Sequence, residues 1–249
     1  MSTPPEASHD LSDFAELLAA ADREGFEFVV IGGCAVGAYA RLLDVVSLSS
    51  DLDLYVTRPT LDRMVNWARR QGAEVLALPR PRALQVAPLR WRDGKRFDLL
   101  TEAPCLPSPE TLLRGAREVT LASHGLEVPI IDPYDLLANT LAVRRPKDEP
   151  HIDILCRFIE EEVVAAFRDE TSGRRQIAPA RRYLDALGRE TLPDTLAARL
   201  VEAAEHPAAF RFLAGRITDA VLAPRLTRRA VERGAGPDVI DIVVERFVG

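Results

Sequence analysis

Lysine is almost absent from this chain of 249 residues, and positive charge is not in excess. Lys95 and Lys147 are the two lysines, so arginine supplies nearly all of the 32 basic side chains, against 38 acidic ones. The formal net charge of −6 creates no general field that would attract nucleic acid. The composition therefore disfavours a DNA-binding protein, and it leaves open an enzyme that acts on an RNA end through a local basic patch.

Cysteine and long apolar segments are scarce as well. Cys34, Cys105 and Cys156 lack the spacing of a metal site and fit buried thiols in a reducing compartment. The first ten residues, MSTPPEASHD, have neither the basic nor the apolar part of a signal peptide. No apolar run approaches the ~20 residues that span a bilayer. We therefore expect a cytoplasmic protein without a membrane segment.

The first quarter of the chain carries alternating helix and strand patterns. After a polar tail over residues 1–9, a helix with one apolar face runs as far as Gly25. Residues 26–31 are almost wholly apolar, which predicts a central strand covered on both faces. Gly32-Gly33 breaks this strand, and the small residues over 34–43 predict a closely packed helix.

The remaining patterns predict a two-part α/β protein. Residues 51–56 alternate strictly in polarity, as in a half-exposed strand, and a helix follows over 59–71. The predicted organisation is a flexible tail, then a mixed sheet flanked by helices, then an all-helical part that begins at Asp132, over residues 1–9, 10–131 and 132–249. Further strands are expected near 73–78, in hairpins over 84–101 and 118–131, and an exposed linker is expected at 171–175.

Two aspartates open the alternating strand. Because successive side chains of a strand point to opposite faces, Asp51 and Asp53 share one face, where their negative charges repel. A divalent cation would relieve this repulsion, and carboxylate oxygens suit Mg²⁺ or Mn²⁺. The competing interpretation is a solvent-facing strand with polar residues at alternate positions.

Two further features have chemical interpretations. Gly32 and Gly33 lie between a buried strand and a helix, where glycine lets backbone N–H groups approach a phosphate. A tight turn without a ligand would use the same residues. Asp98 occupies an apolar strand, where an unpaired charge is costly. It would serve either as a third metal ligand or as the salt-bridge partner of Arg96 or of an arginine elsewhere in the chain.

The order of these features resembles the nucleotidyltransferase superfamily that shares its palm with polymerase beta. The shared order is an apolar strand, Gly-Gly, a helix, the Asp-x-Asp strand, and a third Asp on a later strand. Further along the chain, three segments look like those of minimal nucleotidyltransferases of the AbiE-toxin type. They are Asp135-Leu136-Leu137-Ala138, Arg145-Pro146-Lys147-Asp148 and Asp153-Ile154. The resemblance covers about half of the chain, and it implies a toxin–antitoxin setting as one of the possible contexts.

The resemblance implies a metal-dependent enzyme that moves an NMP group from an NTP to a hydroxyl acceptor and releases pyrophosphate. Asp51 and Asp53 would bridge two metal ions ~4 Å apart. Asp98 would bind the ion that activates the acceptor hydroxyl, and it would accept the proton. The residues implied for the triphosphate are Gly32, Gly33, Ser49 and Lys147, with Asp148 orienting Lys147.

Two positions depart from the family pattern. Ser47 stands where such families often place an arginine, two residues before the hydroxyl that Ser49 retains. Thr140 stands where a lysine is common in the helix that follows Asp-Leu-Leu-Ala. These departures support an alternative in which the chain is a noncatalytic nucleotidyltransferase-fold module, for binding or as an antitoxin.

A dinucleotide-binding unit is a weaker alternative. Gly32, Gly33 and Gly37 follow a strand, and an acidic residue lies ~20 residues further on, as that fingerprint requires. However, the middle glycine of the fingerprint is missing, and the acids open their strand instead of closing it.

The acceptor and the partners stay open at this level. Relatives of the toxin type modify tRNA or protein, whereas others modify small molecules such as antibiotics. A cognate antitoxin or a second copy of the chain would be a further partner. Arginines of the helical part could face RNA, or could simply be solvated: Arg174, Arg175, Arg181 and Arg182, and Arg225, Arg228 and Arg229.

Overall fold

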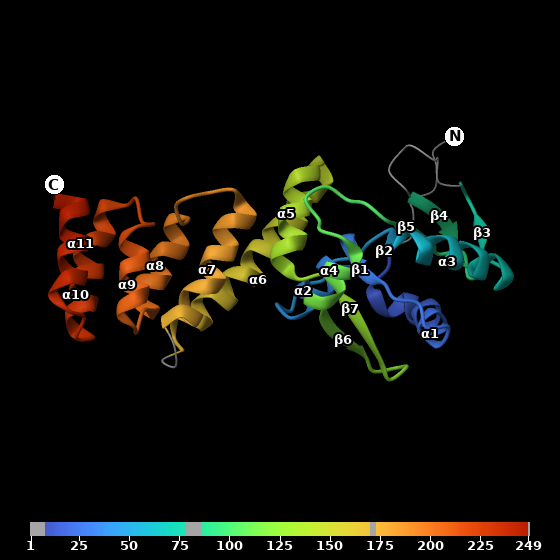
Figure 1. Cartoon of the computed structure of the whole chain (residues 1–249), viewed down its shortest axis with the longest axis horizontal. Helices are drawn as coiled ribbons and strands as arrows, with labels where there is room; N and C mark the ends of the chain where they lie inside the picture. The colour runs from blue at the N-terminus through green and yellow to red at the C-terminus, as the bar shows by residue number, and fades with distance from the viewer. Residues whose placement is uncertain (1–7, 78–85, 170–172, 249) are drawn as a thin grey trace. The chain divides into compact units, whose positions relative to one another are not determined.

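The computed structural model describes residues 8–77, 86–169 and 173–248 (Figure 1). The chain forms two compact units, Met1–Leu155 and Cys156–Gly249. The last strand ends at Ile130, just before Asp132, where the helical part is expected to begin. The first compact unit, however, continues past the predicted boundary at 131 and includes the next helix.

The first unit contains a mixed, seven-stranded sheet, which confirms the predicted α/β class. The strand order is β3-β4-β5-β2-β1-β7-β6. The central strand β1 pairs antiparallel with β2 and parallel with β7, and β2 pairs parallel with β5. The strands are β1 Val29–Ile31, β2 Asp51–Tyr55, β3 Glu74–Val75, β4 Val86–Arg90, β5 Arg96–Leu100, β6 Arg117–Leu121 and β7 Leu126–Ile130.

Side-chain caps fix where several helices of this unit begin. Asp10 accepts the backbone N–H groups of Ser12 and Asp13 at the first helical turn. Asp132 likewise accepts the N–H of Tyr134, and Pro133 occupies the first helical position, where proline is favoured. The helical segments are η1 Leu11–Phe14, α1 Ala15–Arg23, α2 Gly32–Arg41, α3 Arg58–Arg70, α4 Pro109–Gly115, α5 Pro133–Val143 and η2 Pro146–Asp148.

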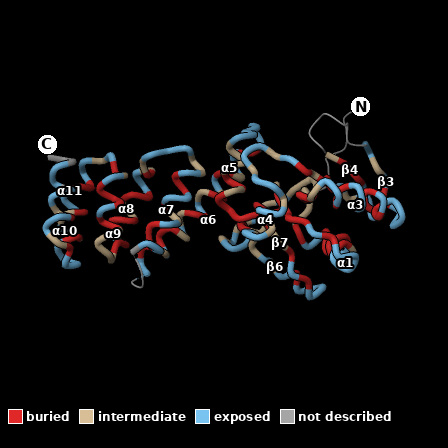
Figure 2. The backbone as a smooth tube through the Cα atoms, viewed as in Figure 1, coloured by how far each residue is buried: buried red, intermediate tan, exposed pale blue. Residues whose placement is uncertain are grey.

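The alternating pattern of β2 divides its side chains between core and site. Leu52 and Leu54 are fully buried, whereas Asp51 and Asp53 are half-buried on the other face. Buried and exposed positions alternate along the helices and strands of the described chain (Figure 2). All three residues of β1 are buried, as expected for a central strand covered on both sides. The core therefore holds β2 firmly, and its acidic face stays open toward the site.

Some expected features lie elsewhere or were missed. His9, assigned to the flexible tail, exchanges two backbone hydrogen bonds with Ser49, at 2.7 and 2.8 Å, so the ordered chain begins before Asp10. The expected linker at 171–175 is wrong over its second half, because α7 begins at Gly173. Residues 1–7, 78–85 and 170–172 lie outside the described residues. The helix α4 has no counterpart among the predicted elements.

The second unit is entirely helical in its described residues. Pro193, Pro207 and Pro224 lie at or next to the starts of helices, because proline fits the first turn. Its helices are the end of α6 Glu149–Phe167, then α7 Gly173–Leu187, α8 Asp194–Ala203, α9 Pro207–Ala214, η3 Ala220–Leu222, α10 Ala223–Glu232 and α11 Pro237–Val248. Among the described helices of the whole chain, none has the length and apolarity that a membrane span requires.

Candidate active site

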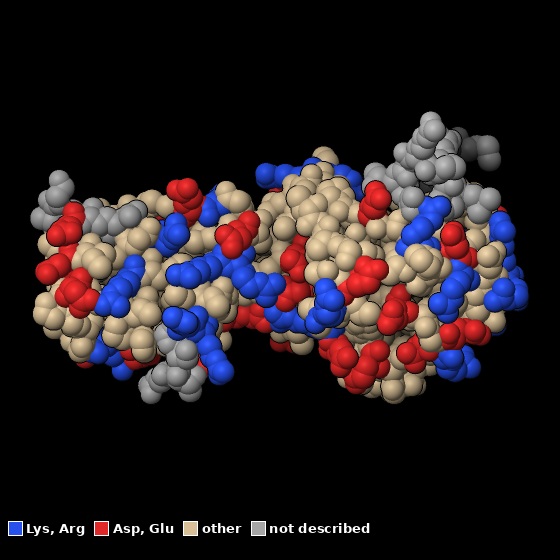
Figure 3. Space-filling model, in the orientation of Figure 1, with Lys and Arg blue, Asp and Glu red and all other residues tan. Residues whose placement is uncertain are grey.

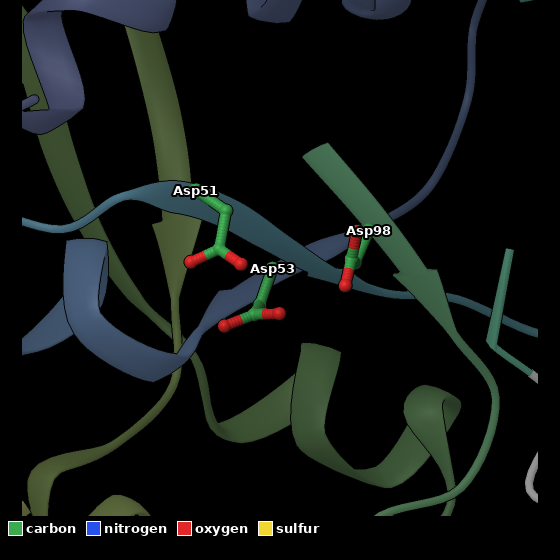
Figure 4. Close-up of side chains that lie close together, drawn as sticks. All are labelled: Asp51, Asp53 and Asp98. Atoms are coloured by element: carbon green, nitrogen blue, oxygen red, sulfur yellow. The ribbon is translucent and has the colours of Figure 1, made fainter. Parts of the chain in front are cut away.

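Three carboxylates converge on one face of the sheet (Figure 4). Asp51 and Asp53 share a face of β2, and the parallel register of β2 with β5 places Asp98 directly beside Asp53. One carboxylate oxygen from each of the three residues lies within 4.8 Å of the others. The two acids of the first strand and the acid of the later strand therefore point into the same space, as the sequence interpretation required.

Glycine at position 32 makes room for this cluster. Gly32 has a φ of +64°, in the left-handed region that glycine adopts readily. A Cβ atom added there would overlap the Oδ2 atom of Asp53. At Gly33, an added Cβ would lie 2.5 Å from the Ser49 Oγ atom. The two glycines are thus required by the close approach of the side chains of Asp53 and Ser49.

We expect Gly32→Ala to lower the free energy of unfolding by about 2–4 kcal/mol, since it combines a left-handed backbone with overlap against Asp53. Gly25→Ala is the matched control, because Gly25 has a similar φ of +70° and no atom within 4 Å of an added Cβ. Urea unfolding of both variants separates the two causes. If Gly32→Ala costs no more than Gly25→Ala, the glycine does not make room for the Asp53 carboxylate.

The first aspartate is held by the segment that precedes it. The hydroxyls of Ser49 and Ser50 donate to Asp51 Oδ1, at 3.4 and 3.2 Å. The thiol of Cys34, on α2, donates to the backbone carbonyl of Asp51 at 3.3 Å. Ser49 is itself anchored by its backbone pairing with His9. This network fixes Asp51 at the start of β2.

The electrostatics of the cluster favour a bound cation. Burial, together with the negative charges of Asp51 and Asp98, raises the pKa of Asp53 to about 7. The charges of Arg145 and Arg96 act in the opposite direction. A carboxyl with such a raised pKa is destabilised in its ionised form, so a cation placed among these oxygens would be bound favourably.

Arg96 lies on the flank of the cluster. Its guanidinium donates to both oxygens of Asp98, at 3.1 and 2.9 Å, and its Nε lies 3.9 Å from Asp51 Oδ2. The salt bridge considered as the alternative for Asp98 is therefore present. It does not saturate the carboxylate, because an ionised Asp offers about four acceptor positions. The Arg96 side chain is 45% exposed.

The segment between α5 and α6 supplies the second arginine. Asp148 is 2% exposed, and its carboxylate accepts hydrogen bonds from the Arg145 Nε and Nη2 atoms, at 2.9 and 3.1 Å, and from the Arg145 backbone N–H at 3.0 Å. Asp148 therefore orients Arg145, whereas the sequence analysis paired it with Lys147, which is exposed. The hydrogen bond to Asp148 is the main cause that raises the pKa of Arg145, and the negative charges of Asp53 and Asp51 raise it further.

The start of α6 lies close to the glycine turn. The His151 Cε1 atom would be 3.6 Å from a Cβ added to Gly33. Burial lowers the pKa of His151, so its imidazole is neutral near pH 7. The sequence analysis assigned no role to His151 or Arg145. The Arg-x-x-Asp spacing of a short capping motif was the available signal for the latter.

Of the two departures from the family pattern, Thr140 has a local side-chain role, and Ser47 contacts its surroundings through its backbone. The Thr140 hydroxyl donates to the Leu136 carbonyl one turn back, at 2.7 Å, so it serves the helix α5. The Ser47 carbonyl packs against the third glycine, where a Cβ added to Gly37 would lie 2.8 Å from it. Neither Ser47 nor Thr140 belongs to the cluster formed by Asp51, Asp53 and Asp98.

The dinucleotide-binding alternative conflicts with the sheet. That fold places its first two strands parallel, with the crossover helix between them. Here β1 and β2 are antiparallel, with Ile31 opposite Asp53. The Gly32-Gly33 turn therefore lies beside an acidic strand instead of inside a parallel dinucleotide unit.

No family model matches the chain, and no curated protein matches it in sequence. Among solved structures, it is similar to the lincosamide antibiotic adenylyltransferase LnuA with lincomycin bound, with 12% identity, a TM-score of 0.46, and coverage of 61% of this chain and 99% of that one. It is also similar to ANT(2")-Ia in complex with adenylyl-2"-tobramycin, with 16% identity, a TM-score of 0.43, and coverage of 69% and 97%.

A third similar structure is an antigenic nucleotidyltransferase-like protein from Paracoccidioides brasiliensis. It shows 15% identity and a TM-score of 0.34, with coverage of 86% of this chain and 98% of that one. All of these TM-scores lie below 0.5.

Proposed function

We propose that the chain is a metal-dependent nucleotidyltransferase of the polymerase-beta-like superfamily. It would move an NMP group from an NTP to a hydroxyl acceptor, with pyrophosphate as the other product. The observation that carries this proposal is the convergence of Asp51, Asp53 and Asp98, from two adjacent strands, beside a glycine turn that opens a helix.

The donor set fits divalent metal ions. All three side chains are carboxylates, the ligands that Mg²⁺ and Mn²⁺ prefer, and Asp53 lies in a cradle that a side chain at position 32 would fill. Asp51 and Asp53 would hold the ions jointly, and Asp98 would hold the one on the acceptor side. Bound ions would neutralise the charge that builds up on the attacking and leaving oxygens.

The transfer itself exchanges one P–O bond for another. The acceptor oxygen bonds to the α-phosphorus, the bond from that phosphorus to the bridging oxygen of the β-phosphate breaks, and pyrophosphate leaves with the electron pair. Asp98 would take the proton of the acceptor hydroxyl. The protein contributes mainly position and charge, as is usual for transfer at phosphorus.

The glycine turn and Ser49 would hold the triphosphate. The helix α2 begins at Gly32, and the preceding residue, Ile31, provides no side-chain cap, so the first N–H groups of the helix can bind an anion. Ser49 contributes a hydroxyl from the β2 side of the turn. Lys147 remains a predicted triphosphate contact, and Asp148 contributes through Arg145.

Arg145 is the cation that we assign to the phosphates. Arg145→Ala should weaken binding of a non-hydrolysable NTP analogue by about 10–100-fold, the value of a charge-assisted hydrogen bond to phosphate. The neighbouring Arg144 is the matched control, because it pairs with Glu149 at 3.2 Å. Asp148→Asn should have an intermediate effect, since it loosens Arg145. A larger loss in Lys147→Ala than in Arg145→Ala would return this role to the lysine.

The overall proposal is tested with two forms of labelled NTP in a cell extract. Relative to the same extract without the added protein, incorporation of label at the α-phosphate into an acceptor should increase, whereas incorporation of label at the γ-phosphate should not increase. Incorporation of the γ-label would indicate phosphoryl transfer and would contradict the proposal. Incorporation should also require a divalent cation and stop on addition of EDTA.

A noncatalytic module is the second candidate. The observation in its favour is the ion pair between Arg96 and Asp98, which places a positive side chain next to the acids. Such a module would bind an NTP without transferring either label. The closeness to the AbiE-toxin type, the association with an antitoxin and the oligomeric state stay predictions.

A further inference from the structure

Charge on the surface is mixed, so recognition of a phosphate depends on individual groups. Figure 3 shows acidic and basic side chains interspersed over the visible face of both units. In the second unit, Arg225 pairs with Glu202 at 2.5 Å and Arg229 pairs with Glu205 at 3.0 Å. These glutamates neutralise two of the arginines that could face RNA. The glycine turn of the first unit instead brings several uncharged polar groups together.

His151 lies in the first turn of α6 and faces the glycine turn. A Cβ atom added to Gly33 would lie 2.5 Å from the Ser49 Oγ atom and 3.6 Å from the His151 Cε1 atom. One point beside Gly33 is therefore close to both side chains. Cε1 is the ring carbon that is bonded to both nitrogens, so the imidazole turns its polar edge toward this point.

The polar edge of this ring is only partly solvated. His151 is half-buried, and within the described ranges no hydrogen bond or ion pair to its side chain is found. Burial lowers the pKa of His151, and the charges of Lys147 and Arg145 act in the same direction, whereas Asp148 opposes them. The neutral ring carries one N–H donor, and a ligand that accepts this N–H would be favoured.

The start of α6 holds the ring in this place. Pro150 lies in the first turn, where proline is favoured, and Ile152 is buried on the inner side of the helix. Just before α6, the buried Asp148 accepts three hydrogen bonds from Arg145. These contacts fix the segment that carries His151, so the ring sits on a supported helix start.

We propose that the ring N–H of His151 donates a hydrogen bond to the triphosphate of the nucleotide. This inference rests on the proposed function, which assigns the triphosphate to the first N–H groups of α2 and to Ser49. The N–H of Gly33 is one of those groups, and His151 lies beside it. A site lined by donors suits phosphate oxygens, which only accept hydrogen bonds. His151 binds the substrate and has no part in the proton transfer assigned to Asp98.

The experiment measures binding of inorganic tripolyphosphate in the presence of Mn²⁺ by calorimetry. Tripolyphosphate has neither ribose nor base, so it isolates the phosphate contacts. His151→Phe should bind it about 10-fold more weakly than the unchanged protein, the loss of one hydrogen bond to a charged group. His151→Gln keeps an N–H donor and should lose less than about three-fold. His151→Ala replaces His151→Phe if the larger ring prevents folding.

The matched control is His124→Phe. His124 is exposed in the turn between β6 and β7, where its Nδ1 atom lies 2.9 Å from the Ser123 hydroxyl. This variant should bind tripolyphosphate as the unchanged protein does, and thermal unfolding verifies that each variant folds. Equal affinity in His151→Phe and His124→Phe would overturn the inference.

Two further results have distinct meanings. A loss in His151→Gln as large as that in His151→Phe would show that the ring supports the fold of the site and donates no hydrogen bond to phosphate, which also overturns the inference. Absence of tripolyphosphate binding in the unchanged protein would instead contradict the triphosphate site of the proposed function, and the inference would fall with it.

Discussion

Asp51→Asn should reduce nucleotidyl transfer by at least about 10³-fold and leave the protein folded. Asp51 is half-buried at the start of β2, and its carboxylate is one of the three that converge on the site. Asn keeps the shape and loses the charge that would hold the cations. The measurement is incorporation of NTP labelled at the α-phosphate, with circular dichroism to verify the fold.

The matched control for this variant is Asp93→Asn. Asp93 lies in the hairpin before β5, where it pairs with Lys95 at 2.7 Å, away from the three acids. Its loss should change transfer by less than about two-fold, because an exposed ion pair contributes little. If Asp51→Asn transfers the label as fast as Asp93→Asn, the acidic cluster is not the catalytic centre.

Asp53→Asn should stabilise the protein when metal is chelated by EDTA. The pKa of Asp53 is about 7 in the folded protein, against an ordinary value of 3.8, because burial and the charges of Asp51 and Asp98 disfavour ionisation. The unfolded chain releases this proton first, so the wild-type fold loses stability as pH rises from about 4 to about 7. The variant avoids this loss, which amounts to a few kcal/mol.

The gain in stability should therefore grow between pH 4 and pH 7 and stay constant above that range. Thermal unfolding of both proteins in EDTA, over a series of pH values, measures it. Addition of Mn²⁺ should then raise the unfolding temperature of the wild type and have little effect on Asp53→Asn. A variant that is less stable than the wild type at pH 8 would contradict the electrostatic description of the site.

The features of this site that depend only on residues close in sequence could be predicted from the sequence. The alternation over β2 was sufficient to place Asp51 and Asp53 on one face, because the two-residue period of a strand is a property of the backbone. The break at Gly32-Gly33 was likewise predictable, since glycine after an apolar run is a local signal. Why glycine is needed there could not be predicted, because the close approach of Asp53 to Gly32 depends on the pairing of β1 with β2.

The contacts between residues far apart in sequence could not be derived from local patterns. The position of Asp98 beside Asp53 depends on the register between β2 and β5, which are joined by 40 residues of intervening chain. The resemblance to a family placed Asp98 in the site, and the strand pattern alone did not. The partners of Arg96 and Arg145 were ambiguous for the same reason, since an arginine has several acids within reach along the sequence.

The sequence analysis paired Asp148 with Lys147 instead of Arg145, because a local pattern does not show which neighbouring cation folds back onto the carboxylate. Lys147 is adjacent to Asp148 in sequence, and it is one of only two lysines in an arginine-rich chain. In the structure, the short η2 turn directs Lys147 to solvent and brings Arg145 back onto the buried carboxylate. The spacing of three residues, typical of a capping motif, outweighs adjacency.

Titration of the purified protein with Mn²⁺, in the presence of a non-hydrolysable NTP analogue, tests the central claim most directly. Calorimetry of the wild type should show metal binding that supports binding of the analogue, and Asp51→Asn, Asp53→Asn and Asp98→Asn should each weaken the metal at least about 10-fold. Asp93→Asn should bind as the wild type does. Equal Mn²⁺ affinity in all of these proteins would show that the three converging carboxylates do not form a metal site.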